Sequence, residues 1–133
     1  MAEFRRPKTV LIVDDQSAIR ELIGIFLERG GYSVLEAGSK SEALQLWSQK
    51  KDEILAVVSD KILSANDSGK EMLSEMVKEK ASLATILISG DPIDSLSGSN
   101  ITEGVDYFVK PFNPADLTQA VDLLLGNDQA LSN

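Results

Sequence analysis

Residues 10–15 read VLIVDD, four aliphatic residues that run directly into two aspartates. Two later stretches have a similar form, since residues 54–60 read ILAVVSD and residues 105–110 read VDYFVK. Short apolar runs of this kind, separated by helix-length segments, predict buried parallel strands. The carboxyl ends of parallel strands share one edge of a sheet, where ligands bind. We therefore expect three carboxylates and one ammonium group to converge at that edge.

The chain has 133 residues, the length of one ordinary domain, and its 43% hydrophobic and 26% charged residues are typical of soluble globular proteins. It contains no cysteine and no histidine, which excludes disulfides, thiolate or imidazole metal ligands, thiol catalysis and an internal phosphohistidine. A net charge of -8 argues against direct binding to nucleic acid or to an anionic membrane. No apolar stretch approaches the ~20 residues that span a bilayer, and residues 1–7 do not have the form of a signal peptide. We therefore expect a cytoplasmic protein.

The hydrophobic pattern predicts five strand–helix units. The strands are expected at residues 9–13, 33–36, 54–59, 84–88 and 106–109. Helices are expected at residues 17–29, from Ser39 or Ser41 to residue 49, at residues 69–79, and from Pro114 onward, because proline suits a first helical turn. Residues 91–104 are rich in serine and glycine, so the fourth helix is predicted to be short or frayed.

Apolar residues at three- and four-residue spacing define the face that each helix should bury. They are Ile19, Leu22, Ile23, Phe26 and Leu27 in the first helix, Ala43, Leu44 and Trp47 in the second, Met72, Leu73, Met76 and Val77 in the third, and Leu117, Ala120, Val121, Leu124 and Leu125 in the last.

Alternating strands and helices imply right-handed crossovers, with helices on both faces of the sheet. We therefore predict an α/β fold, a flavodoxin-like doubly wound parallel sheet of five strands in the order 2-1-3-4-5, with five helices. The ligand crevice of such a sheet lies between strands one and three, where the acidic residues are expected. The predicted organisation is an N-terminal arm at residues 1–7, one domain at residues 8–126 and a C-terminal tail at residues 127–133.

Four motifs at strand ends carry a resemblance to a known family. They are the acidic pair Asp14-Asp15 after strand one, Asp60 after strand three, Ser89 after strand four and Lys110-Pro111 after strand five. In this order they resemble the receiver domain of bacterial response regulators, the CheY-like superfamily. The resemblance covers residues 8–125, and residues 106–112 (DYFVKPF) are very similar to the family's fifth-strand ending. Taken alone, each motif has an ordinary structural explanation, such as a turn and helix N-cap for the acidic pair.

The resemblance implies a metal site and a phosphoacceptor. Asp60 would accept the phosphoryl group and would also bind Mg²⁺. Asp15 would bind the ion directly, and Asp14 would bind it through water. The backbone carbonyl of Ile62 would be a further ligand.

The resemblance also implies the groups that contact the phosphoryl oxygens. The Ser89 hydroxyl would hydrogen-bond them, and Lys110 would pair with their charge. Tyr107 would be an aromatic switch whose ring turns inward when Ser89 moves. The Lys110–Pro111 peptide would be cis, which X-Pro bonds permit at small cost.

The chemistry suits these residue types. A carboxylate and a phosphoryl group are both negative, so transfer depends on positioning and charge neutralisation. Mg²⁺ prefers an octahedral shell of carboxylates, waters and phosphoryl oxygens, and the product would be an aspartyl phosphate. The resemblance therefore implies a phosphoryl-accepting receiver of a two-component system. Such a protein is not an enzyme in its own right, but it assists its own phosphorylation and dephosphorylation.

The implied partners are proteins. The phosphoryl donor would be a phosphohistidine on a sensor histidine kinase or a phosphotransfer protein. Phosphorylation would bias a two-state surface, formed by the last two helices and strand five, toward an unidentified downstream protein. We expect no direct nucleic-acid binding, no membrane binding, and a monomer or weak homodimer. The chain would be either a stand-alone receiver or part of a longer protein.

The sequence departs from the family after Asp60. Leu63 and Ser64 stand where Met-Pro is usual, and Gly69 comes about one residue late. Ser89-Gly90 replaces the commoner Thr-Ala pair, as in receivers attached to hybrid sensor kinases.

Three other functions fit parts of the sequence. A phosphorylation-silent receiver that acts as a protein-interaction module usually lacks one of the motif residues, and here all of them are present. A magnesium-dependent phosphatase with an aspartate nucleophile usually has Asp-x-Asp after strand one. A flavodoxin-type carrier needs a glycine-rich phosphate loop at the same place.

Overall fold

A computed structural model describes residues 8–61, 63, 67–89, 105–109 and 113–126, and for residues 105–109 it describes the backbone. The predicted N-terminal arm, fourth helix and C-terminal tail lie outside these residues, as do Ile62, Ser64 and the Lys110–Pro111 peptide. Among the described residues, no helix combines the length and the hydropathy needed to cross a membrane.

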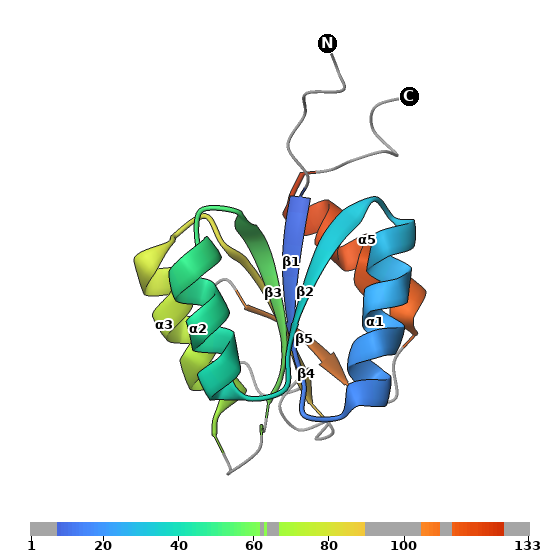
Figure 1. The fold of residues 1–133 in the computed structure, drawn as a ribbon. Helices are drawn as coiled ribbons and strands as arrows, with labels where there is room; N and C mark the ends of the chain where they lie inside the picture. The colour runs from blue at the N-terminus through green and yellow to red at the C-terminus, as the bar shows by residue number, and fades with distance from the viewer. Residues whose placement is uncertain (1–7, 62, 64–66, 90–104, 110–112, 127–133) are drawn as a thin grey trace.

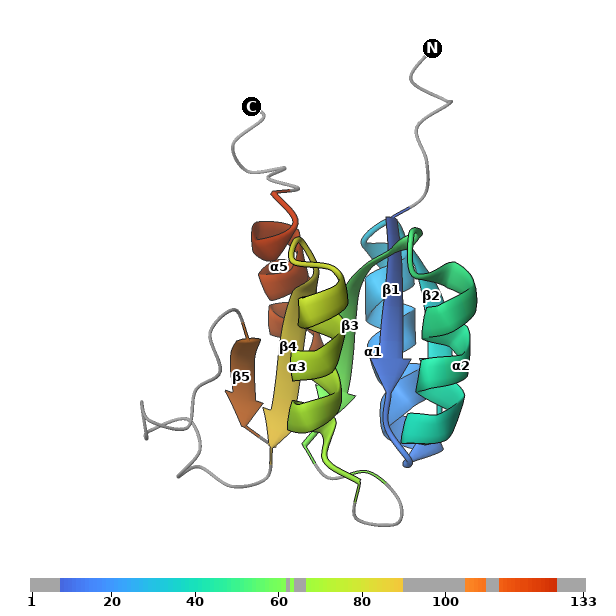
Figure 2. The same ribbon diagram turned by 90° about the vertical axis from the view of Figure 1, so that its left-hand side faces the viewer.

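A parallel sheet forms the centre of the fold. Its strands are β1 (Lys8–Val13), β2 (Tyr32–Ala37), β3 (Ile54–Asp60), β4 (Ala84–Ser89) and β5 (Val105–Val109). Their order is β2-β1-β3-β4-β5 and every neighbouring pair is parallel, which confirms the predicted topology (Figure 2). Val13 pairs with Ala37 and with Ser59, and Asp60 pairs with Ile88. The carboxyl ends of β1, β2, β3 and β4 therefore lie at one edge.

The described helices cover both faces of the sheet, as Figure 1 shows. On one face lie α2 (Lys40–Lys50) and α3 (Gly69–Glu79), and on the other lie α1 (Ser17–Arg29) and α5 (Pro114–Leu124). The side chains of Ser39, Ser68 and Asn113 each accept a backbone N–H from the first turn of α2, α3 and α5, respectively. Gly31, just after α1, has a φ of 97°, in the left-handed region that favours glycine.

The sheet divides the interior into two half-cores. The first half-core, under α2 and α3, comprises Leu11, Val13, Ala37, Ala43, Trp47, Ile54, Val57, Leu63, Met72, Leu73, Met76, Leu83 and Leu87. The second half-core, under α1 and α5, comprises Val10, Ile12, Ile23, Leu27, Tyr32, Ala56, Val58, Ala84, Ile86, Ile88, Leu117 and Val121. Successive residues of a strand point to opposite faces, and helices cover both. The central strands therefore carry apolar residues on both faces rather than at alternate positions only.

Three leucines that were predicted to face inward are exposed, so these predictions were wrong. Leu22 is 43% exposed, Leu44 37% and Leu124 39%. In α2, Leu46 packs against the first half-core instead of Leu44. At 3.6 residues per turn, Leu44 is rotated by about 100° from the buried Ala43 and so faces away from the sheet.

Candidate functional site

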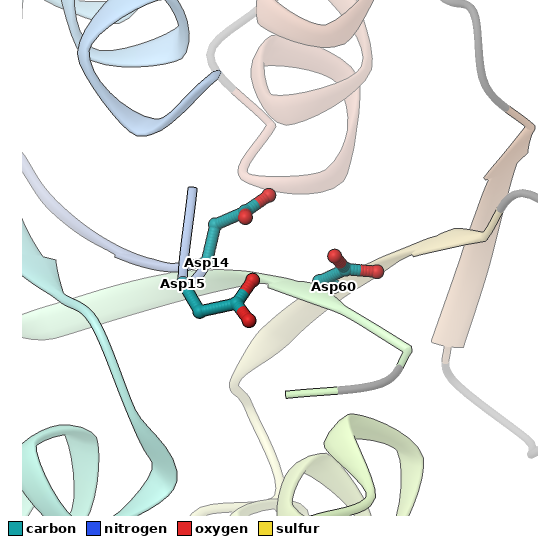
Figure 3. Close-up of side chains that lie close together, drawn as sticks. All are labelled: Asp14, Asp15 and Asp60. Carbon is teal, nitrogen blue, oxygen red and sulfur yellow. The ribbon is translucent and has the colours of Figure 1, made fainter. Parts of the chain in front are cut away.

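Three carboxylates meet at the carboxyl edge of the sheet. Asp14 and Asp15 follow directly after β1, and Asp60 is the last residue of β3. One carboxylate oxygen from each lies within 4.8 Å of the others (Figure 3). The pairing of β1 with β3 explains this convergence, because Val13 and Ser59, the residues just before Asp14 and Asp60, are partners in the register. The predicted convergence of the three acids at this edge is confirmed.

The acids differ in their exposure to solvent. Asp14 is 1% exposed, Asp60 is partly buried and Asp15 is exposed. The Oδ1 atom of Asp14 accepts the Gln16 N–H at 2.9 Å, and the Asp14 N–H donates to the Ala37 carbonyl at 3.1 Å. The cluster is therefore anchored by a buried acid and opens to water at Asp15.

The ordinary explanation of the acidic pair as a turn and a helix N-cap holds only in part. The bond from the Gln16 N–H to Asp14 closes a local turn. However, the N-cap of α1 is Gln16, whose side chain makes no capping hydrogen bond. Neither aspartate therefore occupies the N-cap position.

The donor set fits a hard divalent cation. Carboxylate oxygens and water are the ligands that Mg²⁺ prefers, and it usually keeps several waters. Three carboxylates within 4.8 Å repel one another, and a divalent cation between them relieves that repulsion. The exposed side at Asp15 leaves room for water.

The start of α3 lies against the backbone of Asp60. The Gly69 N–H donates to the Lys61 carbonyl at 2.8 Å. A Cβ atom placed on Gly69 would lie 1.9 Å from the Asp60 carbonyl oxygen and 2.7 Å from Ser59 Oγ. Only glycine fits this approach. Sequence reasoning noted Gly69 only for its late position, although a glycine as the first residue of a helix after Asp60 was an available signal.

A second residue that sequence reasoning missed is Arg20, on α1. Its Nη1 donates to the Asp14 carbonyl oxygen at 2.7 Å. The sequence offered one weak signal, an arginine near the start of the helix that follows the acidic pair.

Two of the remaining predicted site residues, Ser89 and Tyr107, lie on β4 and β5, respectively. Ser89 is the last residue of β4 and is 1% exposed. It directly follows Ile88, the partner of Asp60. Tyr107 lies in β5, where its backbone pairs with Leu87. Lys110 and Ile62 lie outside the described residues.

The comparison with known families identifies the family of the chain. The profile of the response regulator receiver domain matches residues 10–122. The chain therefore belongs to the receiver domain family of two-component response regulators. This result agrees with the resemblance carried by the strand-end motifs.

Similar proteins include transcriptional regulators. The chain is 30% identical over 122 residues to the phosphate regulon transcriptional regulatory protein PhoB of Pseudomonas aeruginosa, covering 89% of this chain and 52% of that protein. It is 29% identical over 120 residues to the alkaline phosphatase synthesis transcriptional regulatory protein PhoP of Bacillus subtilis, covering 89% of this chain and 48% of that protein. The chain thus spans about half the length of these two relatives.

Solved receiver domains have the same fold. A receiver domain from Clostridium thermocellum matches with a TM-score of 0.79 at 28% identity, covering 92% of this chain and 98% of the other. The receiver domain of the hybrid histidine kinase CckA matches with a TM-score of 0.73 at 26% identity, covering 88% and 98%, respectively.

Proposed function

We propose that this receiver domain accepts a phosphoryl group on Asp60 in a Mg²⁺-dependent reaction. The donor is a phosphohistidine on a sensor histidine kinase or a phosphotransfer protein, in the cytoplasm. The observation that carries the proposal is the cluster of Asp14, Asp15 and Asp60 within 4.8 Å at the edge of the sheet. The receiver family to which the chain belongs makes this chemistry the natural role for such a cluster.

In the proposed reaction, one carboxylate oxygen of Asp60 forms a bond to phosphorus. The phosphorus–nitrogen bond of the donor breaks, and its electron pair returns to the imidazole, which is then protonated. Asp15, Asp60 and the Ile62 carbonyl would hold Mg²⁺ directly and Asp14 would hold it through water, and the ion would supply neutralisation of negative charge. Asp60 remains partly exposed, which keeps the acceptor oxygen within reach of the donor. Asp14 is buried, and its carboxylate is held by the Gln16 N–H.

Ser89 and Lys110 complete the proposed site. Ser89, buried at the end of β4, donates its hydroxyl to a phosphoryl oxygen, and Lys110 pairs with the phosphoryl charge. Movement of Ser89 toward the phosphoryl group makes room for the ring of Tyr107. This coupling shifts the population of a protein-binding surface. The same residues let the domain assist its own phosphorylation and dephosphorylation.

The test is phosphorylation by a small donor. Incubation with phosphoramidate and Mg²⁺ is expected to add one phosphoryl group, measured by intact-mass spectrometry. The addition should be lost with EDTA and in Asp60→Asn. It should persist in Asp52→Asn, the same change at an exposed aspartate between α2 and β3. Phosphorylation that survives in Asp60→Asn, or that never occurs in the wild type, refutes the proposal.

The alternative, a phosphorylation-silent interaction module, has less support because the acidic cluster is complete. It predicts no phosphoryl addition and no response of the amide NMR spectrum to beryllofluoride with Mg²⁺.

A further inference from the structure

Arg20 connects α1 to the carboxyl ends of two neighbouring strands. Its Nη1 donates to the carbonyl oxygen of Asp14, just after β1, at 2.7 Å. Its Nε donates to Oε1 of Glu36, near the end of β2, at 3.0 Å. The Arg20 side chain is only 20% exposed. The bond to the Asp14 carbonyl is partly buried, which reduces competition from water and strengthens it. The pair with Glu36, whose side chain is 38% exposed, is open to solvent.

The carbonyl that accepts from Arg20 belongs to the peptide that joins Asp14 to Asp15. The Asp14 N–H is held by the Ala37 carbonyl, and its carboxylate is held by the Gln16 N–H. Arg20 holds the third group, the carbonyl. Because a peptide unit is planar, fixing this carbonyl also fixes the nitrogen of Asp15. Arg20 therefore sets the position from which the exposed carboxylate of the cluster projects.

Glu36 and Gly38 keep Arg20 in this place. Glu36 pairs with the guanidinium and offsets its charge next to the acidic cluster. A Cβ atom on Gly38 would lie 3.3 Å from Arg20 Nη1, a tight contact, so glycine leaves the guanidinium its space. The arrangement orders the acidic pair without adding a net positive charge beside it.

We propose that Arg20, held by Glu36, is a positioning residue for the metal site, an inference that rests on the proposed function. Residues that orient metal ligands change metal affinity by about 10–100-fold when they are mutated. We therefore expect Arg20→Gln to weaken Mg²⁺ binding about tenfold. A weaker affinity would distinguish positioning from a simple charge effect. Removal of a positive charge near an acidic site by itself strengthens cation binding.

The experiment is a Mg²⁺ titration of the whole chain, followed by ¹H–¹⁵N NMR. The matched control is Arg29→Gln, the same change on the same helix, where the exposed arginine lies over the Phe26 ring at 5.7 Å. Arg29→Gln should bind Mg²⁺ as tightly as the wild type, or slightly tighter. Equal affinities in Arg20→Gln and Arg29→Gln overturn the inference and leave the proposed function standing. Absence of Mg²⁺ binding in the wild type overturns both.

Two further variants keep the test decisive if Arg20→Gln folds poorly. Arg20→Lys keeps the charge, but an ammonium cannot reproduce the two-pronged geometry of a guanidinium. Its Mg²⁺ affinity should fall between those of Arg20→Gln and the wild type, and a wild-type affinity contradicts the inference.

Glu36→Ala should also weaken Mg²⁺ binding, but not when Arg20 is already glutamine. Additive effects of the two changes contradict their coupling.

A metal-free measurement separates positioning from general loss of structure. The carbonyl ¹³C of Asp14 and the amide ¹⁵N of Asp15 belong to the peptide that Arg20 contacts. Their chemical shifts should change in Arg20→Gln much more than in Arg29→Gln, while amides of β4 remain unchanged. Shifts spread evenly over the sheet would indicate a merely structural role.

Discussion

Glu79, at the end of α3, joins two helices through its side chain. Its Oε1 accepts hydrogen bonds from Lys51 Nζ at 3.0 Å and from Trp47 Nε1 at 3.1 Å. These bonds, with that from Lys51 the stronger influence, lower the pKa of Glu79 from its reference value of 4.5. The ionised carboxylate is therefore the form that the folded state favours.

The pH dependence of this contact follows from the direction of the shift. A carboxyl group with a lowered folded-state pKa stabilises the fold fully above its unfolded pKa, and the stabilisation is lost as the pH falls through the folded value. Trp47 is the single tryptophan of the chain, so its fluorescence should report the protonation of Glu79, with a midpoint below 4.5. The transition should disappear in Glu79→Gln and persist in Glu75→Gln, at an exposed position of the same helix. A midpoint at or above 4.5 would contradict the structure.

For single residues, the sequence predicted the three aspartates of the cluster but not the residues that hold them in place. Asp14, Asp15 and Asp60 were predictable because strand ends share an edge, which is a property of the topology alone. The bond from Arg20 to the Asp14 carbonyl depends on the rotation of α1 and on the side-chain conformation. Neither is encoded in the spacing of residues along the chain. The contact of Gly69 with Asp60 likewise depends on how closely α3 approaches β3.

The start of α3 determines how closely this helix approaches Asp60. In Gly69→Ala, the new Cβ would lie 1.9 Å from the Asp60 carbonyl oxygen, so the end of β3 or the start of α3 must move. Overpacking of this kind typically costs about 1–3 kcal/mol. We expect Gly69→Ala to lower the free energy of unfolding by about that amount, measured by urea denaturation, and to slow phosphorylation of Asp60.

The control for this prediction is Gly24→Ala on α1. Its Cβ would meet Val34, Glu36 and Ile12 at 3.6 to 3.8 Å, which is ordinary van der Waals contact. Alanine is favoured over glycine inside a helix by about 1 kcal/mol, so this variant should be as stable as the wild type or more stable. Equal losses in the two variants would show that the cost at Gly69 is not steric.

Helix positions were predicted more reliably than helix faces. The bounds of α1 and α3 agree with the predictions. Local signals mark two of these ends, since two glycines follow α1 and the Ser68 side chain caps the start of α3. The predicted buried faces were wrong at Leu22, Leu44 and Leu124, which are exposed. An apolar pattern wider than the buried stripe does not indicate which of its edges meets the sheet. That choice depends on the neighbouring helices.

Over the whole molecule, folding brings together acids from distant parts of a chain with a net charge of -8. The cluster exists only when β1 and β3 are paired, so a cation that binds it stabilises the folded state alone. At a Mg²⁺ concentration of about 100 times the Kd, this binding raises the free energy of unfolding by about 2.7 kcal/mol. Calorimetry should therefore show a Tm that rises with Mg²⁺.

A salt control separates binding from screening of the net charge. NaCl at the same ionic strength screens all the charges but does not bridge the three carboxylates. The rise in Tm with Mg²⁺ should exceed that with NaCl, and the difference should shrink in Asp60→Asn and persist in Asp52→Asn. Equal rises with both salts would contradict the metal site.

The sheet divides the interior, so substitutions in one half-core are separated from those in the other. Side chains beneath α1 and α5 belong to one half-core, and those beneath α2 and α3 belong to the other. A substitution beneath one pair of helices should therefore disturb the packing of its own half-core more than that of the other. The outer surfaces of α1 and α5, apart from Arg20, can thus vary without repacking the layer under α2 and α3.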